Sequence, residues 1–143
     1  MRIADIMAPS VVSIEPEESA ALAARLLARY NIGLLPVCSS GGVLRGVLTD
    51  RDLILRGAAA GRALDHLPVQ RIMTRYPITA EPEEDPRAAA ARMAAHQVRR
   101  LPVVHEGIVV GIISLGDLAR CGRYEMELSK ALTDISDPVR HME

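Results

Sequence analysis

The sequence predicts an α+β fold made of two similar β-α-β-β-α repeats that share one domain. Three observations carry this prediction. Short motifs recur along the chain in the same order and at a constant spacing. Each copy also alternates strand signals with amphipathic helix signals in the same order. Finally, a half of about 60 residues buries too little surface to be comfortably stable alone. We therefore expect the two repeats to pack sheet to sheet.

The repeat is visible as matched pairs of motifs separated by 66 residues. The pairs are Ile6-Met7 with Ile72-Met73, Glu15-Pro16-Glu17-Glu18 with Glu81-Pro82-Glu83-Glu84, and Leu35-Pro36-Val37 with Leu101-Pro102-Val103. The spacing falls to 65 residues at Gly46 and Gly111, because the segment 38–45 is one residue longer than the segment 104–110. A single-residue difference in a turn is what two copies of one fold would show.

Each repeat is expected to open with a short strand, at residues 11–14 and 78–80, and to continue with a helix. Ser19 and Asp85 are matching N-cap candidates. Pro86 stands at the first helical position, where its missing amide costs nothing.

The two first helices are expected to face the core with residues four apart. This pattern predicts the buried stripes Leu22 with Leu26 and Ala89 with Met93, and leaves Arg25, Arg29 and Arg92 in water. Asn31 is expected to end the first of these helices.

Strands are expected next at residues 32–37 and 98–104, each with its proline near a sheet edge or a strand end. Gly41-Gly42 and Glu106-Gly107 predict the turns that follow. After each turn comes a third strand and a second helix, which begin in the two most informative stretches of the chain.

Those stretches run from Gly46 to Asp52 and from Gly111 to Asp117, and both have the pattern Gly-x-x-Thr/Ser-x-x-Asp. One interpretation is a capping box, in which the hydroxyl caps a helix and the acid three residues later bonds to the cap amide. The other is a ligand site, because free helix amides favour phosphate and an adjacent carboxylate can accept both hydroxyls of a ribose. The two interpretations are compatible.

The expected organisation has three parts: residues 1–64 as repeat one with a linker, 65–122 as repeat two, and 123–143 as a C-terminal tail. The linker is the Gly-bracketed stretch from residue 57 to residue 69, which has no apolar period. Helix formers at 124–132 predict a short helix that frays into disorder after it.

Composition excludes several classes of function. With 17 basic and 18 acidic residues, the chain has no electrostatic reason to bind nucleic acid. It has three Tyr, no Phe and no Trp, and so lacks an aromatic platform for single strands. No apolar run is long enough for a membrane span, and patterned sequence starts directly after Met1. A cytoplasmic protein without membrane contact is expected.

We also expect neither a catalytic nor a metal site. Cys38 and Cys121 have no partner at metal-binding spacing, and both are interpreted as small reduced residues. The four histidines form no nucleophile-base-orienter set and are interpreted as surface or turn residues: His66, His96, His105 and His141. His105-Glu106 lacks the second histidine of a zinc-binding helix.

Taken together, these motifs resemble a tandem pair of cystathionine-beta-synthase (CBS) domains, the arrangement called a Bateman module. The resemblance rests on the two Ile-Met pairs, the two Leu-Pro-Val strands and the two Gly-x-x-Thr/Ser-x-x-Asp stretches, and it covers residues 1 to about 122. It implies two repeats related by pseudo-twofold symmetry in a stand-alone protein.

The resemblance also implies two clefts between the repeats that bind adenosine-containing ligands such as AMP, ADP or ATP. In the family the acid of the motif holds the ribose and the hydroxyl helps with ribose or phosphate. Those roles fall on Asp52 with Thr49 and on Asp117 with Ser114. No other cofactor is implied.

Further family positions fall on residues that differ between the repeats. Phosphate-binding residues before the Leu-Pro-Val strand match Arg99 and Arg100 in repeat two, whereas repeat one has Gly33 and Leu34. Arg51 matches a basic residue that crosses to the other repeat's cleft, and its counterpart is Gly116. The residues expected to flank the base are Val12, Ser13, Ile78 and Thr79. We therefore expect unequal clefts, with the phosphate preference in that of repeat two.

The function expected from this resemblance is a non-enzymatic regulatory or sensor module that acts on a regulated protein whose identity the sequence does not give. Alternatives are an S-adenosylmethionine or NAD(H) binder, or a ligand-free module that dimerises or contacts a partner protein. The presence of both Asp52 and Asp117 favours a ligand, because a scaffold needs neither. A homodimer is also expected, with the helices that begin at Asp52 and Asp117 in the interface and the segment 124–132 across the neighbour.

Overall fold

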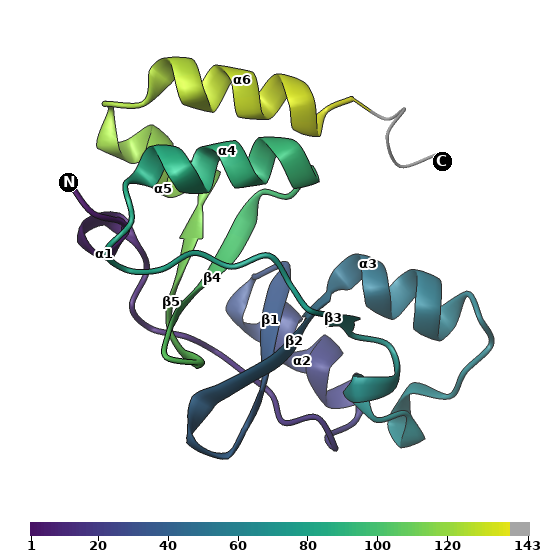
Figure 1. Cartoon of the computed structure of the whole chain (residues 1–143). Helices are drawn as coiled ribbons and strands as arrows, with labels where there is room; N and C mark the ends of the chain where they lie inside the picture. Colours follow the sequence, from purple (N-terminus) through teal and green to yellow (C-terminus); the bar gives the residue numbers. More distant parts are fainter. Residues whose placement is uncertain (138–143) are drawn as a thin grey trace. The chain divides into compact units, whose positions relative to one another are not determined.

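The structure is a computed structural model that describes residues 1–137. Its main elements follow in chain order (Figure 1): α1 (Ile3–Ile6), α2 (Ala20–Tyr30), β1 (Leu34–Ser39), β2 (Val43–Thr49), α3 (Asp50–Asp52), β3 (Thr74–Arg75), α4 (Pro86–His96), β4 (Arg100–His105), β5 (Ile108–Ser114), α5 (Leu115–Cys121) and α6 (Glu125–Ile135). A π-helical segment, η2 (Leu53–Ala58), continues α3 directly. Short 3-10 turns lie at η1 (Ser40–Gly42), η3 (Leu64–His66) and η4 (Val69–Arg71). The mixture of helices and antiparallel strands confirms the predicted α+β class.

The chain divides into two compact units, each with its own core. The repeat-one unit comprises Val11–Pro77 with Gly107–Val109. The repeat-two unit comprises Met1–Ser10, Ile78–Glu106 and the chain from Val110 onward. Each unit thus contains most of one repeat, except that residues 107–109 of the β4–β5 hairpin are grouped with the repeat-one unit.

The short segment that leads into each repeat packs in the unit of the other repeat. Ile3 N donates to Glu84 O at 2.8 Å, and Val69 N donates to Glu18 O at 2.9 Å, so the two lead segments make equivalent contacts. Both Ile3 and Val69 are fully buried. The lead segments 3–7 and 69–73 therefore complete cores to which they are not adjacent in the sequence.

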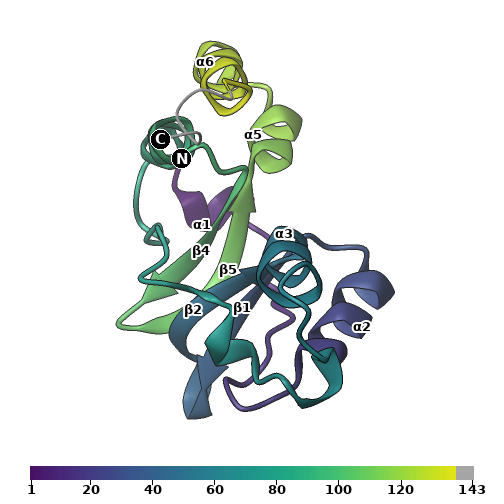
Figure 2. The same ribbon diagram turned by 90° about the vertical axis from the view of Figure 1, so that its right-hand side faces the viewer.

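In the repeat-one unit, β1 and β2 form an antiparallel hairpin whose register places Leu35 opposite Leu48. β3 adds a short third strand on β2. Gly41 and Gly42 form the hairpin turn with φ of 78° and 81°, as predicted, because only glycine adopts these angles without strain. The helices α2 and α3 lie on the same side of this hairpin (Figure 2).

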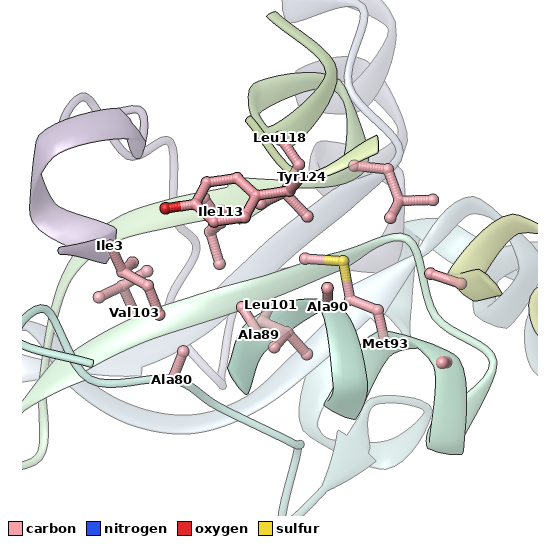
Figure 3. Packing of buried hydrophobic residues seen from close by; sticks show 13 residues of the cluster. Ile3, Ala80, Ala89, Ala90, Met93, Leu101, Val103, Ile113, Leu118 and Tyr124 are labelled. Atoms are coloured by element: carbon pink, nitrogen blue, oxygen red, sulfur yellow. The ribbon is translucent and has the colours of Figure 1, made fainter. Parts of the chain in front are cut away.

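In the repeat-two unit, β4 pairs with β5, and Glu106 and Gly107 form the predicted turn. α4 packs beside α6, and Figure 2 shows the two helices end-on next to each other. Figure 3 shows the core of this unit, in which Met93 from α4, Leu101 from β4 and Ile113 from β5 are fully buried.

The start and end of α2 and the start of α4 were predicted correctly. Ser19 Oγ accepts a hydrogen bond from Leu22 N at 3.1 Å, and Asp85 Oδ1 accepts one from Arg87 N at 2.9 Å. Pro86 is the first residue of α4, and Asn31 ends α2 in the left-handed conformation.

The first strands and the buried row of α2 were predicted wrongly. The expected strands at 11–14 and 78–80 are extended segments with a single bridge each, from Ile14 to Val37 and from Ala80 to Val103. The buried row of α2 is Ala20, Ala23 and Leu27, whereas Leu22 and Leu26 are only half-buried beside it. Small alanines let the helix backbone approach the sheet closely. The stripe expected on α4 is confirmed, because Ala89 and Met93 are fully buried.

The predicted tail helix exists and is longer than expected, since α6 reaches Ile135. Ala131 of α6 and Tyr124, the residue before the helix, are both buried within the chain, and the guanidinium of Arg87 in α4 lies 5.3 Å from the centre of the Tyr124 ring. Only the opposite face of α6 remains for a neighbouring molecule. The predicted disorder at the end of the tail and His141 fall on residues 138–143, which lie outside the described part of the chain.

Candidate functional site

Both Gly-x-x-Thr/Ser-x-x-Asp stretches form the capping box that their spacing predicts. In repeat one, Thr49 N donates to Asp52 Oδ2 at 3.0 Å and Asp52 N donates to Thr49 Oγ1 at 3.1 Å. In repeat two, the equivalent bonds between Ser114 and Asp117 measure 2.9 and 3.2 Å. The Ser114 hydroxyl also donates to Asp117 Oδ2 at 3.0 Å. The capping interpretation is therefore correct for both copies.

Capping uses only one oxygen of each carboxylate. Asp52 and Asp117 are 8% and 9% exposed, and they are the only charged residues among 1–137 that are buried. In each, Oδ2 is engaged by the cap and Oδ1 faces an arginine of the same helix. A buried acid held in one orientation, with a second oxygen available for exchange, is suited to accept a hydroxyl from a ligand.

The two arginines beside these acids were missed by sequence reasoning. Arg56 Nε lies 3.8 Å from Asp52 Oδ1, and Arg56 also donates to the carbonyls of Ile72 and Met73. Arg120 Nη2 pairs with Asp117 Oδ1. Their positions four and three residues after the acids, on the same helical face, were the available signal.

Gly116 makes room for the Arg120 contact. A Cβ atom on Gly116 would lie 3.2 Å from Arg120 Nη1, so the glycine lets the guanidinium fold back over the start of α5. The counterpart of Gly116 in repeat one is Arg51, an exposed residue whose amide donates to Asp50 Oδ1 at 2.8 Å. The expected reach of the Arg51 side chain to the other cleft stays a prediction.

The start of each second strand lies against the start of the second helix. Leu115 N donates to Arg99 O at 3.0 Å, and Asp50 N donates to Gly33 O at 3.4 Å. Arg99 is thus placed next to the Ser114–Asp117 motif, and both Arg99 and Arg100 are exposed. The structure thus places the backbone of Arg99 beside the first turn of α5, and phosphate binding by Arg99 and Arg100 stays a prediction.

The segments expected to flank the base differ in their surroundings. Val12 and Ile78 are half-buried and pack on the cores of their units. Ser13 is exposed, and a hydrogen bond from it partly offsets the burial that raises the pKa of the Cys38 thiol. Cys38 and Cys121 are both free thiols, and the raised pKa of Cys38 makes it a poor nucleophile.

Thr79 is fixed through its backbone. Arg92 Nη1 donates to Thr79 O at 3.1 Å and to Glu84 Oε1 at 2.7 Å, so one guanidinium joins α4 to the segment that leads into β4. Arg92 was expected to stay in water, and it is instead half-buried. Its hydrogen bond lowers the pKa of Glu84, and the same pairing raises the pKa of Arg92.

This pair predicts a pH effect on stability. Because the pKa of Glu84 is lower in the folded state than in the unfolded state, the ionised carboxylate stabilises the fold above about pH 4.3. That contribution is lost as the pH falls through the lowered folded pKa. Glu84→Gln should therefore cost under about 1 kcal/mol at pH 7 and less at pH 3, since the pair is partly exposed. Urea unfolding at pH 7 and pH 3 measures the loss in free energy of unfolding. An equal loss at both pH values would contradict the prediction.

No group of three or more His, Cys, Asp or Glu in residues 1–137 could hold a metal ion. None of the helices in that range is both long and apolar enough to cross a bilayer.

The chain is similar to known proteins along most of its length. The chain is 39% identical to the CBS domain-containing protein YhcV of Bacillus subtilis over 134 residues, which cover 94% of each chain. The crystal structure of Hypoxic Response Protein I with two coordinated zinc ions aligns with a TM-score of 0.78 at 32% identity, over 84% of this chain and 98% of that one.

A second related structure contains nucleoside ligands. The CBS domain pair of protein MJ0100, in complex with 5-methylthioadenosine and S-adenosyl-L-methionine, aligns with a TM-score of 0.75 at 28% identity, over 87% of this chain and 98% of that one. The CBS domain family itself matches residues 3–58 and 69–123, the ranges that contain both capping boxes. The chain therefore belongs to the CBS-domain family and carries two CBS domains in tandem.

Proposed function

We propose that the chain is a regulatory module without catalytic activity of its own that binds an adenosine-containing ligand, AMP, ADP or ATP, through the acids Asp52 and Asp117. One observation carries the proposal. Each acid is buried and oriented by a capping box, and its Oδ1 faces the guanidinium of an arginine that follows it in the same helix. A ribose hydroxyl can replace that guanidinium without disturbing the cap.

The neighbouring residues support a preference for phosphate in repeat two. Arg99 and Arg100 are exposed at the start of β4, where the backbone of Arg99 contacts the first turn of α5. Gly33 holds the equivalent place in repeat one and offers no charge. We propose that the motif of repeat two, with Arg99, Arg100 and the predicted help of Arg51, distinguishes phosphorylated ligands from adenosine.

S-Adenosylmethionine is the second candidate ligand. It is favoured by the related pair from MJ0100, whose structure contains S-adenosyl-L-methionine and 5-methylthioadenosine. A sulfonium ligand does not use Arg99 and Arg100 as a phosphate does, so those two arginines separate the candidates.

Isothermal titration of the chain with AMP, ADP, ATP, NAD and S-adenosylmethionine tests the proposal, with GMP as the control for the base. Any ligand that binds should also stabilise the fold, by about 2.7 kcal/mol at 100 times its dissociation constant. Unchanged thermal unfolding with every adenosine compound at millimolar concentration would refute ligand binding and would favour the ligand-free interaction module.

We also propose that the module forms a homodimer through the helix that follows Asp52. Ile54 and Leu55 are 60% and 49% exposed on this helix, which leaves an apolar surface uncovered in the single chain. Light scattering should give a mass near twice 15.5 kDa at high micromolar concentration. Ile54→Lys should shift the mass toward that of one chain, and a monomeric wild type would contradict the proposal.

A further inference from the structure

A pocket lies in the repeat-one unit, away from its capping box. This pocket of about 490 Å³ is lined by the loop after the first extended segment, by the β1–β2 hairpin and by β3 with its flanks. On β2 the lining residues are Val43, Leu44 and Arg45, at the opposite end of the strand from Thr49. The volume falls within the range of small-molecule sites, roughly 300–1,000 Å³.

The walls of this pocket are fixed by backbone pairing. Gln70 N donates to Pro16 O at 3.1 Å, which joins two of the lining stretches. Arg75 of β3 lies opposite Gly46 of β2 (Figure 1 shows the two strands together). Met73, also in the lining, is buried. The side chains at the rim are therefore presented by a rigid frame.

Tyr76 at the rim has an unusual conformation. Its side chain is 93% exposed, whereas Tyr124 is buried in the repeat-two core. Its φ of 52° lies in the left-handed region, which bulky residues rarely adopt, and the following Pro77 further favours an extended backbone at this position. An aromatic ring held in water on a strained backbone does not serve a core, and strain of this kind gathers at functional sites.

The other repeat shows that the fold does not require these side chains. The frame itself is the same in both, since Pro16, Gly46 and Met73 match Pro82, Gly111 and Met7. The residues able to bind a ligand differ: Gln70, Arg75, Tyr76 and Arg45 correspond to Ala4, Pro9, Ser10 and Val110. The guanidinium groups of Arg45 and Arg75 and the exposed ring of Tyr76 are therefore present in repeat one and absent from repeat two.

We propose that this pocket binds a small organic phosphate that carries a flat aromatic ring. Arg45 and Arg75 line the same pocket, and neither has an ion-pair partner within residues 1–137. Guanidinium groups match phosphate oxygens in geometry and charge, and the Tyr76 ring offers a face for stacking. Glu17 also lines the pocket, so Arg45, Arg75 and Glu17 together carry a net charge of +1. The site uses none of the residues proposed to bind adenosine.

Phenyl phosphate is the probe for this site, followed by titration calorimetry and by tyrosine fluorescence. Arg45→Gln and Arg75→Gln should each weaken its binding about 10-fold or more, as expected for a lost charged hydrogen bond. Tyr76→Ser, which installs the residue of the other repeat, should weaken phenyl phosphate but leave inorganic phosphate unchanged. Glu17→Gln should strengthen both. Phenol should bind much more weakly than either anion.

Two controls keep the outcome specific. Arg62→Gln removes an exposed arginine of the same unit that does not line the pocket, and it should leave the affinity unchanged. The double variant Asp52→Asn/Asp117→Asn should lose adenosine binding and retain phenyl phosphate, which separates this site from the proposed function. The inference is overturned if no phenyl phosphate binds at about ten millimolar, if Arg62→Gln has the same effect as Arg75→Gln, or if the double variant abolishes binding.

Discussion

Gly111→Ala is expected to lower the free energy of unfolding by roughly 1–3 kcal/mol, the usual cost of overpacking a core. A Cβ atom at this position would lie 2.5 Å from Met7 Sδ and 2.8 Å from Ala8 O. The methionine can move, but the carbonyl cannot, because Ala8 and Ile112 exchange two backbone hydrogen bonds of 2.9 Å. Relief of the clash therefore requires the bridge between residue 8 and β5 to open.

The matching substitution in repeat one should behave alike. At Gly46 a Cβ atom would lie 2.7 Å from both Met73 Sδ and Thr74 O. Since Gly46 and Gly111 belong to the frames of different units, the double variant should show the sum of the two costs. Valine at either position should cost more than alanine.

Gly116→Ala is the matched control. Its nearest neighbour would be the mobile guanidinium of Arg120 at 3.2 Å, and alanine is favoured over glycine in a helix by about 0.8–1 kcal/mol. Stability should therefore stay unchanged or rise slightly. Urea unfolding measures all these variants, and a Gly111→Ala chain as stable as the wild type would refute the packing argument.

Features encoded by neighbouring residues were predictable from the sequence. The N-caps at Ser19 and Asp85, the left-handed Asn31 and the two capping boxes each depend on bonds within about four residues. The pattern of the capping boxes led to two predictions, a helix start and a carboxylate that binds a ligand. The structure shows the two helix starts, whereas ligand binding by the carboxylates stays a proposal.

Features that depend on tertiary contacts were not predictable in this way. Nothing local in residues 3–7 indicates that they complete the core beside Glu84, and the repeat itself suggests that they belong with the residues that follow. The buried row of α2 was missed because leucine was expected inward, whereas Ala20 and Ala23 permit closer packing. Arg56 and Arg120 were missed because a basic residue in a helix is more often a solvated side chain.

Asp117→Asn is expected to weaken adenosine binding by about 10- to 100-fold, because a hydrogen bond to a charged partner contributes roughly 1.5–3 kcal/mol. Asparagine keeps an oxygen that can accept from Ser114 N, so the helix start is largely preserved. The lost property is the negative charge on the oxygen that faces Arg120. Titration calorimetry with adenosine, AMP and ATP measures the effect.

The same experiment decides whether the two sites are unequal. Asp52→Asn should have the smaller effect on ATP, because Gly33 stands where repeat two has Arg99 beside its motif. The triple variant Arg51→Ala/Arg99→Ala/Arg100→Ala should remove the preference for ATP over adenosine, because only the phosphates lose partners. Arg25→Ala is the control, since it removes an exposed charge on α2. If the preference survives the triple substitution while Asp52→Asn abolishes tight binding, repeat one holds the principal site.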